Sequence, residues 1–468
     1  MSTEPRVTAI VLAAGQGTRM KSPLPKVLHP LAGRPMIHYV VDAALQAGAH
    51  DVVVVTGHGR EHVEAYLAKA FGDRVRTAVQ AEQLGTGHAV SMALPQVRDD
   101  AGLLLLLCGD TPLLDAAELR SLVGLLRETP GPLAVLTMRP ADATGYGRIL
   151  RDAGGAISGI REHKDCSAEE RAIGETNPGV YVARAPFLRD AITRIRPDNA
   201  QRELYLTDVV ALAAKAGGVA STLVKDPMNV AGINDRAQLA QAEDVLYQRI
   251  SDAHRRAGVT IRASARIEAS VIVEPDATIE HQVVLRGQTR IGAGAVIDVG
   301  SVLTDVTVAA GANLKPYTIA TSSRIGEKAQ IGPFSHLRPD SDIDADAHVG
   351  NFVETKKTRL GKGAKANHLA YLGDGEIGPG ANIGAGTIFC NYDGFRKHKT
   401  EIGEGAFVGS DSQIVAPVRI GKGAYVATGT TVTRDVPDDA LAIARVKQEN
   451  KEGYASKLKG RLAASAKK

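Results

Sequence analysis

The 468-residue sequence contains no tryptophan, and aromatic residues make up only 4% of it. Its three cysteines, Cys108, Cys166 and Cys390, are scattered. An odd, dispersed set argues against a disulfide framework or a zinc cluster and is typical of a reducing cytoplasm. No apolar run approaches the ~20 residues of a membrane-spanning helix, and the N-terminus lacks a secretory pattern. We therefore expect a cytoplasmic protein without a membrane partner.

An excess of charge of one sign is also missing from most of the chain. The net charge is +4, but residues 447–468 contain seven basic and two acidic side chains, so the remainder is about neutral. A solvated basic tail is the simpler interpretation, and a tail that reaches an anionic ligand is the alternative. Nothing else in the sequence supports nucleic-acid binding.

The first half alternates apolar runs with segments of helical periodicity. The runs VTAIVLAA, DVVVVTG and GLLLLLCGD, at 7–14, 51–57 and 102–110, are continuous, as strands buried on both faces of a parallel sheet are. The segment PMIHYVVDAALQAG, at 35–48, has helical spacing and a closing glycine. This alternation predicts a doubly wound, Rossmann-like α/β domain over residues 1–234. Such domains bind ligands at the carboxyl ends of their strands.

Glycine is abundant, with 49 residues, and many of these belong to a repeat in the second half. Residues 235–258 are expected to form one connecting helix, and from 259 to 446 an apolar residue recurs at every sixth position. A chain that bends after each short strand explains this period, with glycine permitting the corner. The period therefore predicts a β-solenoid, interrupted by the polar and aromatic segment 389–401 and followed by the tail 447–468. The residues in phase are Ile267, Val273, Ile279, Leu285, Ile291, Ile297, Leu303, Ile325, Ile331, Leu337, Ile343, Val349, Ile402, Val408, Ile414, Ile420, Val426 and Val432.

The stretch LAAGQGTRMKSPLPK, residues 12–26, follows the first expected strand. It lacks the GK[ST] ending of a P-loop and the third glycine of G-x-G-x-x-G. Gly15 and Gly17 allow backbone N–H groups to approach a phosphate, while Arg19 and Lys26 supply positive charge. The alternative interpretation is a strand-to-helix turn with surface cations.

Asp110 ends another apolar strand and is expected at the same edge of the sheet. A carboxylate at this position can bind a divalent metal ion. Alternatively, the sequence GDTPLLD can act as a helix cap before Pro112.

Further motifs accompany this loop, and together they carry a resemblance. They are QAEQLGTGHA at 80–89, GD at 109–110, TGYGRI at 144–149, REHKD at 161–165, TNPGVY at 176–181 and GIN at 232–234. With LAAG, GTRM and PK in residues 12–26, they resemble the motifs of sugar-nucleotide pyrophosphorylases. With the hexapeptide-type second half, nearly the whole chain resembles the bacterial bifunctional N-acetylglucosamine-1-phosphate uridyltransferase/glucosamine-1-phosphate acetyltransferase family. The resemblance implies a left-handed parallel β-helix, an exception to right-handed crossovers, and a homotrimer with shared acetyl sites.

For the first half, the resemblance implies uridylyl transfer from UTP to N-acetylglucosamine 1-phosphate with release of pyrophosphate. Two anions must meet in this reaction, so a divalent cation, Mg²⁺, is expected on Asp110 and Asn234. Arg19 and Lys26 would hold the triphosphate. The other expected contacts are Leu12, Ala13, Ala14, Gly15, Gln80, Gly85 and Thr86 for the nucleotide, and Gly147, Glu162 and Asn177 for the sugar. Cys108 stands where some relatives carry tyrosine.

For the second half, the resemblance implies acetyl transfer from acetyl-CoA to glucosamine 1-phosphate. An amine attacks a thioester only when neutral, so a histidine, with a reference pKa of ~6.5, suits the role of base. His368, in KANHLAYLGD, occupies the family's catalytic-base position, although a lone histidine is more often structural. The other expected contacts are Arg338, Lys356, Tyr371 and Asn382 for the sugar phosphate, and Ala385, Asn391, Tyr392, Ser410, Thr428 and Arg445 for acetyl-CoA.

Three alternatives remain at this stage. Cys390 offers a mechanism in which its thiolate is acetylated first, which the family's direct transfer disfavours. A single-activity sugar-1-phosphate nucleotidyltransferase would use the solenoid only for assembly or regulation, and His368 and Arg445 argue against it. A non-catalytic interaction protein is disfavoured because Arg19, Lys26, Asp110 and Asn234 are all present.

Overall fold

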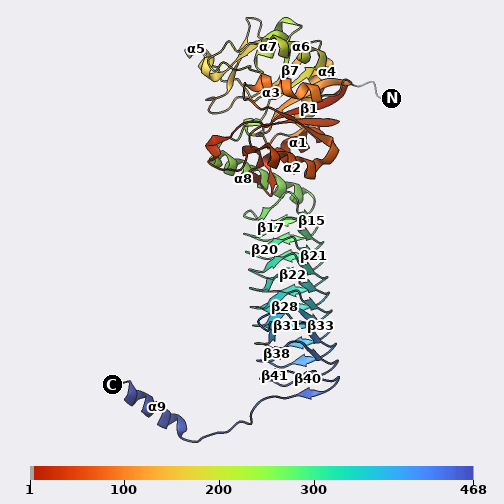
Figure 1. The fold of residues 1–468 in the computed structure, drawn as a ribbon, viewed down its shortest axis with the longest axis vertical. Coiled ribbons are helices and arrows are strands. Elements are labelled where there is room, and N and C mark those ends of the chain that lie inside the picture. Colours follow the sequence, from red (N-terminus) through yellow and green to blue (C-terminus); the bar gives the residue numbers. More distant parts are fainter. Residues whose placement is uncertain (1–4, 467–468) are drawn as a thin grey trace. The chain divides into compact units, whose positions relative to one another are not determined.

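The computed structural model describes residues 5–466, and the chain divides into two compact units within helix α8 (Arg236–Arg256). Unit 1 extends to Arg249 and unit 2 begins at Ile250, and Figure 1 colours both along the sequence. The boundaries expected from the sequence, at 234, 258 and 446, stay predictions.

A seven-stranded sheet forms the centre of unit 1, in the order β12-β7-β11-β6-β1-β4-β5. Strand β11 is antiparallel to both neighbours, whereas the other pairs are parallel. The strands are β1 (Arg6–Leu12), β4 (Asp51–Thr56), β5 (Val75–Val79), β6 (Ala101–Cys108), β7 (Leu133–Thr137), β11 (Tyr181–Arg184) and β12 (Val219–Leu223). The three runs read as strands from the sequence are β1, β4 and β6.

Helices cover both faces of this sheet because successive side chains of a strand point to opposite sides. Val7, Ala9 and Val11 of β1 belong to the core beneath α1, α2 and α4, and Ile10 belongs to the core beneath α3, α6 and α7. The helices of unit 1 before α8 are α1 (Met36–Gln46), α2 (Arg60–Phe71), α3 (Thr86–Ala93), α4 (Ala116–Glu128), α5 (Ala168–Arg171), α6 (Ala185–Arg194) and α7 (Asp208–Lys215). The doubly wound α/β fold predicted from the sequence is therefore confirmed.

Smaller elements complete unit 1 and carry several of its site residues. They are the antiparallel sheet of β8 (Gly147–Arg151), β9 (Ile157–Arg161) and β10 (Thr176–Asn177), the hairpin of β2 (Pro30–Leu31) and β3 (Arg34–Pro35), and the short 3₁₀ helices η1 (Thr18–Met20), η2 (Lys26–Leu28), η3 (Gly72–Arg74), η4 (Leu94–Gln96), η5 (His163–Asp165) and η6 (Pro227–Val230).

Unit 2 is a solenoid of short parallel strands in three sheets. The first sheet contains β13 (Thr260–Ile261), β16 (Thr278–Ile279), β19 (Val296–Ile297), β22 (Asn313–Leu314), β25 (Gln330–Ile331), β28 (His348–Asn351), β31 (Lys365–His368), β34 (Asn382–Ile383), β37 (Phe407–Val408), β40 (Tyr425–Val426) and β42 (Leu441–Ala442). The second contains β14 (Arg266–Ile267), β17 (Val284–Arg286), β20 (Val302–Thr304), β23 (Ile319–Thr321), β26 (His336–Leu337), β29 (Glu354–Lys356), β32 (Tyr371–Gly373), β35 (Ile388–Cys390), β38 (Gln413–Val415) and β41 (Thr431–Val432). The third contains β15 (Ile272–Val273), β18 (Arg290–Ile291), β21 (Thr307–Val308), β24 (Arg324–Ile325), β27 (Asp342–Ile343), β30 (Arg359–Leu360), β33 (Gly375–Ile377), β36 (Thr400–Ile402) and β39 (Val418–Ile420).

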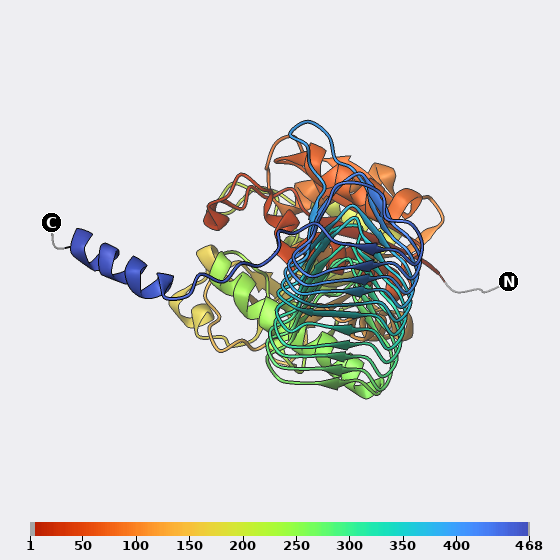
Figure 2. The same ribbon diagram turned by 90° about the horizontal axis from the view of Figure 1, so that it is seen from below.

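All the residues found in six-residue phase are buried in one continuous core inside these coils, which Figure 2 shows stacked one on another. The phase looks broken near His368 because the inward positions there are Thr355, Leu360 and Ala366, each 0% exposed. Thr355 and Ala366 are weak apolar signals, and the step from Thr355 to Leu360 is five residues. The solenoid is nevertheless continuous through this region.

The expected interruption begins later than the sequence suggests. Phe389 is 1% exposed and pairs with Ile414, so it belongs to the core rather than to the loop. The excursion follows Cys390 and ends where β36 begins at Thr400. The last helix is α9 (Tyr454–Ser465), in the predicted tail. Of the helices between residues 5 and 466, none has the length and apolar character that crossing a membrane requires.

Candidate active sites

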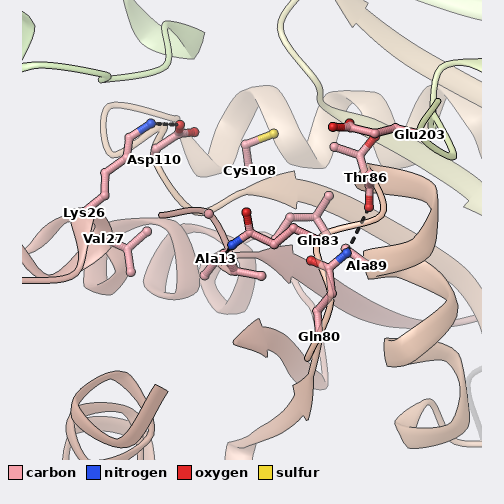
Figure 3. Close-up of a pocket in the computed structure, with 14 residues that line it drawn as sticks. Ala13, Lys26, Val27, Gln80, Gln83, Thr86, Ala89, Cys108, Asp110 and Glu203 are labelled. Atoms are coloured by element: carbon pink, nitrogen blue, oxygen red, sulfur yellow. Dashed lines mark hydrogen bonds and ion pairs between the residues drawn. The ribbon is translucent and has the colours of Figure 1, made fainter. Parts of the chain in front are cut away.

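A cluster of polar side chains lies where β1 and β6 end in unit 1. Lys26 Nζ is 2.5 Å from Asp110 Oδ2 and 2.8 Å from Asn234 Oδ1, and Figure 3 shows the first of these contacts. Arg19 Nη2 donates to the same Asn234 oxygen at 2.9 Å. Asp110 and Asn234, which are 84 and 208 residues from Lys26 in the sequence, thus meet at its ammonium group. The fold brings together all four side chains that the sequence suggested for phosphates and metal.

Local structure explains how Lys26 reaches this place. Gly17 has a left-handed conformation, with φ of 61°, and a Cβ there would lie 2.5 Å from Lys26 Cβ. Glycine is therefore required at 17 for the close passage of Lys26, whereas a Cβ at Gly15 would meet nothing within 4 Å. Gly15 leaves open space in front of the loop.

Asp110 is not a helix cap. The N-cap of α4 is Asp115, whose carboxylate accepts a hydrogen bond from Ala117 N at 2.8 Å. The main chain of Asp110 is held by Ile233, whose N–H donates to the Asp110 carbonyl at 2.9 Å. The Asp110 carboxylate is left to bind cations, and the helix-cap interpretation is wrong.

The oxygens of Asp110 and Asn234 fit a metal ion because both already converge on one positive group. Carboxylate and amide oxygens are ligands that Mg²⁺ prefers. Residues 5–466 contain no group of three or more histidine, cysteine or acidic side chains arranged for a metal. A metal ion at this place would therefore take its remaining ligands from water or substrate.

A cavity of about 290 Å³ opens beside this cluster (Figure 3). The expected residues that line it are Leu12, Ala13, Ala14, Gly15, Lys26, Gln80, Gly85, Thr86 and Asp110. It is also lined by Cys108, which the sequence analysis noted at this site, and by residues that sequence reasoning missed, namely Val27, Gln83, Ala89 and Glu203. Gln83 belongs to the same QAEQLGTG motif as its expected neighbours, and its place in that motif could have predicted it as a lining residue.

Three segments are hydrogen-bonded to form the walls of this cavity. Gln83 Nε2 donates to the Ala14 carbonyl at 2.9 Å, which ties the 80–87 segment to the end of β1. Leu206 N donates to Thr86 Oγ1 at 3.0 Å. Gly85 has φ of 105°, and a Cβ there would lie 2.6 Å from Leu204 O, so only glycine fits.

A second cavity, of about 180 Å³, adjoins the first and shares Leu12, Thr86 and Cys108 with it. The three residues expected at the sugar, Gly147, Glu162 and Asn177, all line this cavity. Glu162 Oε1 accepts a hydrogen bond from Thr207 at 3.1 Å. Burial raises the pKa of Glu162, opposed by that hydrogen bond and reinforced by nearby acidic side chains.

Cys108 lies between the two cavities. Burial, with a smaller effect of Asp110, raises the pKa of the Cys108 thiol to about 12. The residue is therefore an uncharged wall at neutral pH, and its thiol contacts the Gly179 carbonyl at 3.8 Å.

In unit 2, His368 lies on the outside of the solenoid at the end of β31. Its Nδ1 is 2.9 Å from Asn351 Oδ1, and the two residues are register partners in β28 and β31. An amide oxygen only accepts hydrogen bonds, so in this pairing Nδ1 is the donor, and in the neutral imidazole Nε2 is the nitrogen with the lone pair. Sequence reasoning missed Asn351, although the register of the repeat places it one coil before His368.

Three of the residues expected at acetyl-CoA form a column with His368 along the solenoid. Neighbouring strands β31, β34, β37 and β40 are in register. The residues two positions after each inward side chain are therefore aligned, at about 4.8 Å per coil. The column consists of His368, Ala385, Ser410 and Thr428, and Arg445 Nη1 donates to the Thr428 carbonyl.

The residues expected at the sugar phosphate are divided between two sheets. Arg338 follows β26, and Lys356 and Tyr371 lie on β29 and β32 of the second sheet, whereas Asn382 lies on β34 of the first. Arg338 Nη1 donates to Glu354 Oε1 at 2.8 Å. One chain therefore places Asn382 on a different sheet from the other three.

The interruption after Cys390 supplies the remaining side chains. A Cβ at Gly373 would lie 2.6 Å from both the Tyr371 hydroxyl and Asn391 Nδ2, so both groups lie close to that glycine. Asn391 Nδ2 also donates to Asp374 Oδ2 at 2.6 Å. The Tyr392 hydroxyl donates to the Gly394 carbonyl at 2.5 Å.

Two family models match the chain in the order of these units. Residues 9–207 match the MobA-like NTP transferase domain, and residues 399–434 match the bacterial transferase hexapeptide of six repeats. Fold and sites together define a nucleotidyltransferase joined to a hexapeptide-repeat transferase, and the parallel strands of unit 2 agree with a left-handed β-helix.

Relatives that match the chain over its full length identify the family within this class of transferases. A bifunctional protein GlmU of Sorangium cellulosum is 70% identical over the whole of both chains. Those of an Anaeromyxobacter species and of Trichlorobacter lovleyi are 52% and 48% identical, covering 97% and 96% of this chain and 93% and 98% of theirs. The chain belongs to the bifunctional GlmU family. The family, the fold class and the two-activity enzyme predicted from the sequence are thereby confirmed, and a non-catalytic protein is excluded.

Proposed function

We propose that the chain makes UDP-N-acetylglucosamine in two steps. Unit 2 transfers an acetyl group from acetyl-CoA to glucosamine 1-phosphate, and unit 1 then transfers uridylyl from UTP to the resulting N-acetylglucosamine 1-phosphate. The convergence of Lys26, Asp110 and Asn234 beside two adjoining cavities is the observation that carries the proposal. The 70% identity to a bifunctional GlmU protein over both units supports it.

In unit 1 a phosphate oxygen of the sugar phosphate attacks the α-phosphorus of UTP, and the bond to the leaving pyrophosphate breaks. Lys26 and Arg19 bind the triphosphate and neutralise charge that grows on the leaving oxygens. The larger cavity holds the nucleotide, with Gln80, Gly85 and Thr86 at the base. The smaller one holds the sugar against Glu162 and Asn177.

Mg²⁺ is the metal that we propose for Asp110 Oδ2 and Asn234 Oδ1. When bound, it would supply positive charge to the phosphate oxygens. Lys26, which contacts both of those oxygens, is then free to turn toward the triphosphate.

In unit 2 the neutral amine of glucosamine 1-phosphate attacks the thioester carbonyl carbon, and the carbon–sulfur bond breaks to release coenzyme A. His368 Nε2 takes the proton of the amine because Nδ1 is held by Asn351. The column of Ala385, Ser410 and Thr428, with Arg445, binds acetyl-CoA. Arg338 and Lys356 bind the phosphate of the sugar.

We further propose a homotrimer in which a second copy completes the acetyl site, because one chain leaves Asn382 on a different sheet from Arg338 and Lys356. The three cysteines are free thiols, which fits the cytoplasm, where UTP and acetyl-CoA are found. The expected ligands remain small molecules, without nucleic acid.

A product assay tests this function. The enzyme is incubated with glucosamine 1-phosphate, acetyl-CoA, UTP and Mg²⁺, and each component is omitted in turn. UDP-N-acetylglucosamine should form only in the complete mixture, and N-acetylglucosamine 1-phosphate should replace the need for acetyl-CoA. Equal formation of a uridylylated sugar without acetyl-CoA from glucosamine 1-phosphate would contradict the two-step scheme and favour a single-activity nucleotidyltransferase.

A further inference from the structure

Three side chains of helix α8 make hydrogen bonds to the main chain of other segments of unit 1. Arg236 Nε donates to the Met20 carbonyl at 3.1 Å, and Arg249 Nη1 donates to the Leu113 carbonyl at 2.7 Å. Between them, Glu243 Oε1 accepts from Ala32 N at 3.2 Å. A step of seven residues puts Arg236 and Glu243 on one side of the helix, whereas Arg249, six residues further on, lies about 120° around the helix axis from Glu243.

Each contact is made to the main chain of a segment that carries a site residue. Met20 follows Arg19, and Leu113 is three residues after Asp110. Ala32 lies between β2 and β3, in the hairpin that follows Lys26. Met20 and Ala32 are 1% and 0% exposed, so these segments are packed at the back of the site.

The segment from Gly17 to Lys26 is held by few regular main-chain contacts of its own. It contains the single turn η1, whose flanking residues Gly17 and Lys21 are both left-handed, with φ of 61° and 49°. No strand neighbour therefore fixes the distance between this segment and Asp110. The side chains of α8 reach both segments.

The first turn of α8 also orients the third member of the cluster. Asn234 N donates to Gln238 Oε1 at 2.7 Å. Arg249, the last residue of unit 1 in the sequence, also donates to Asn229, which in turn donates to Glu118 at 3.2 Å. Arg249 is thus held from α4 and η6 at the same time as it holds Leu113.

We propose that α8 is a positioning element of the nucleotidyl site. Arg236 and Glu243 hold the segment of Arg19 and Lys26, and Arg249 holds the segment of Asp110. Together they set the separation at which Lys26, Asp110 and Asn234 reach one another. This inference rests on the proposed uridylyl transfer in unit 1, and it assigns these α8 residues no contact with substrate.

The test compares truncation and conservative variants of the full-length chain. Arg236→Ala and Arg249→Ala should each lower kcat of uridylyl transfer about tenfold, because misplaced groups lose near-attack geometry. Arg236→Lys and Arg249→Lys keep a donor and should restore most of the rate lost in the alanine variants. Glu243→Gln keeps an acceptor and should retain most of the parent rate. Gln241→Ala, an exposed position on the same helix, is the control and should stay within about twofold of the parent.

Two further measurements separate positioning from simple stabilisation. Calorimetric titration with UTP alone should show weaker binding for Arg236→Ala, which loosens the triphosphate segment, and little change for Arg249→Ala. Conversely, Arg249→Ala should require more Mg²⁺ for half-maximal rate, because it loosens the Asp110 segment. Acetyl transfer, measured on the same samples, should not change in any variant.

Unchanged kcat and UTP affinity in folded alanine variants would overturn the inference while leaving the uridylyl activity of the parent intact. A lower melting temperature with unchanged kinetics would reduce these contacts to a structural role and likewise overturn it. Absence of uridylyl transfer in the parent enzyme would instead remove the proposed function on which the inference rests.

Discussion

The two units assemble their candidate sites in opposite ways. Unit 1 collects Lys26, Asp110 and Asn234 from distant parts of the chain at the carboxyl ends of buried strands, where their side chains face one another at 2.5–2.8 Å. Unit 2 repeats one position along the outside of its coils, so His368, Ala385, Ser410 and Thr428 are aligned by register. The site in unit 1 depends on where its loops lie, and the site in unit 2 depends on the register of its neighbouring strands.

This difference has a consequence for sensitivity to mutation. A site made by loops that meet is vulnerable to changes in the segments that hold those loops. A site made by register is vulnerable to changes that displace one coil against the next. Each unit should also respond without altering the reaction of the other.

The largest separation of the two activities is expected from Asp110→Ala. Loss of the carboxylate should lower uridylyl transfer about 10³-fold, because a group that holds charge in a desolvated site is removed, while acetyl transfer is retained. Pyrophosphate release and acetyl transfer are measured on one preparation. Asp115→Ala is the matched control: it removes the cap of α4, which costs about 1 kcal/mol of stability, and should leave both rates unchanged. Equal losses in both variants would contradict the role of Asp110.

His368→Ala should produce the reverse pattern. Acetyl transfer should fall about 10²-fold or more, as for the loss of a general base, and uridylyl transfer should be retained. Asn351→Ala should have a smaller effect on the same reaction, because the imidazole stays but its tautomer is no longer fixed. His281→Ala, an exposed histidine of the same solenoid, serves as the control. Full acetyl transfer in folded His368→Ala would contradict the role of His368 as the base and would favour the alternative in which the Cys390 thiolate is acetylated first.

A smaller effect, on register, is expected from Gly350→Ala. A Cβ at 350 would lie 1.9 Å from Asn367 O, so the coils that carry Asn351 and His368 must separate. Overpacking of this kind costs about 1–3 kcal/mol, and acetyl transfer should fall while uridylyl transfer does not. Thermal unfolding and both rates are measured beside Gly460→Ala, where a Cβ would meet nothing within 4 Å. Unaltered acetyl transfer in Gly350→Ala would show that register does not position His368.

The smallest effect is a pH dependence in unit 1. Burial raises the pKa of Glu162, and Asp165, Asp208 and Glu203 add to this effect. The folded state therefore binds more protons than the unfolded state, so stability is lost as pH rises from the unfolded pKa through the folded one. Glu162→Gln should raise the melting temperature slightly at pH 7 and not at pH 3, while weakening sugar-phosphate binding. A melting temperature lowered equally at both pH values would contradict this assignment.

Much of the fold could be predicted because its signals are local. Buried parallel strands are continuous apolar runs, and the six-residue phase marks most of the inward positions of the coils. The prediction was less accurate where the inward residues are Thr355 and Ala366, or where Phe389 appears in a polar context, because burial at those positions is decided by neighbouring coils.

The candidate sites were predictable only where a motif marks them. The sequence predicts that Gly17 lets the backbone approach a phosphate, and the structure adds that the lack of a side chain at 17 is needed for the passage of Lys26. The identity of the α4 cap, Asp115 rather than Asp110, depends on where the helix begins. The α8 contacts have no local signature, because their partners are other segments of the folded chain.

The sequence by itself determined the alternation of strands and helices and the solenoid, because these follow from periodicity along the chain. Its motifs, through their resemblance to a family, indicated candidate residues for each site. Only the tertiary structure decided which loops meet, which oxygens converge on Lys26 and which nitrogen of His368 remains free. Those properties depend on distances between residues far apart in sequence, and packing sets such distances.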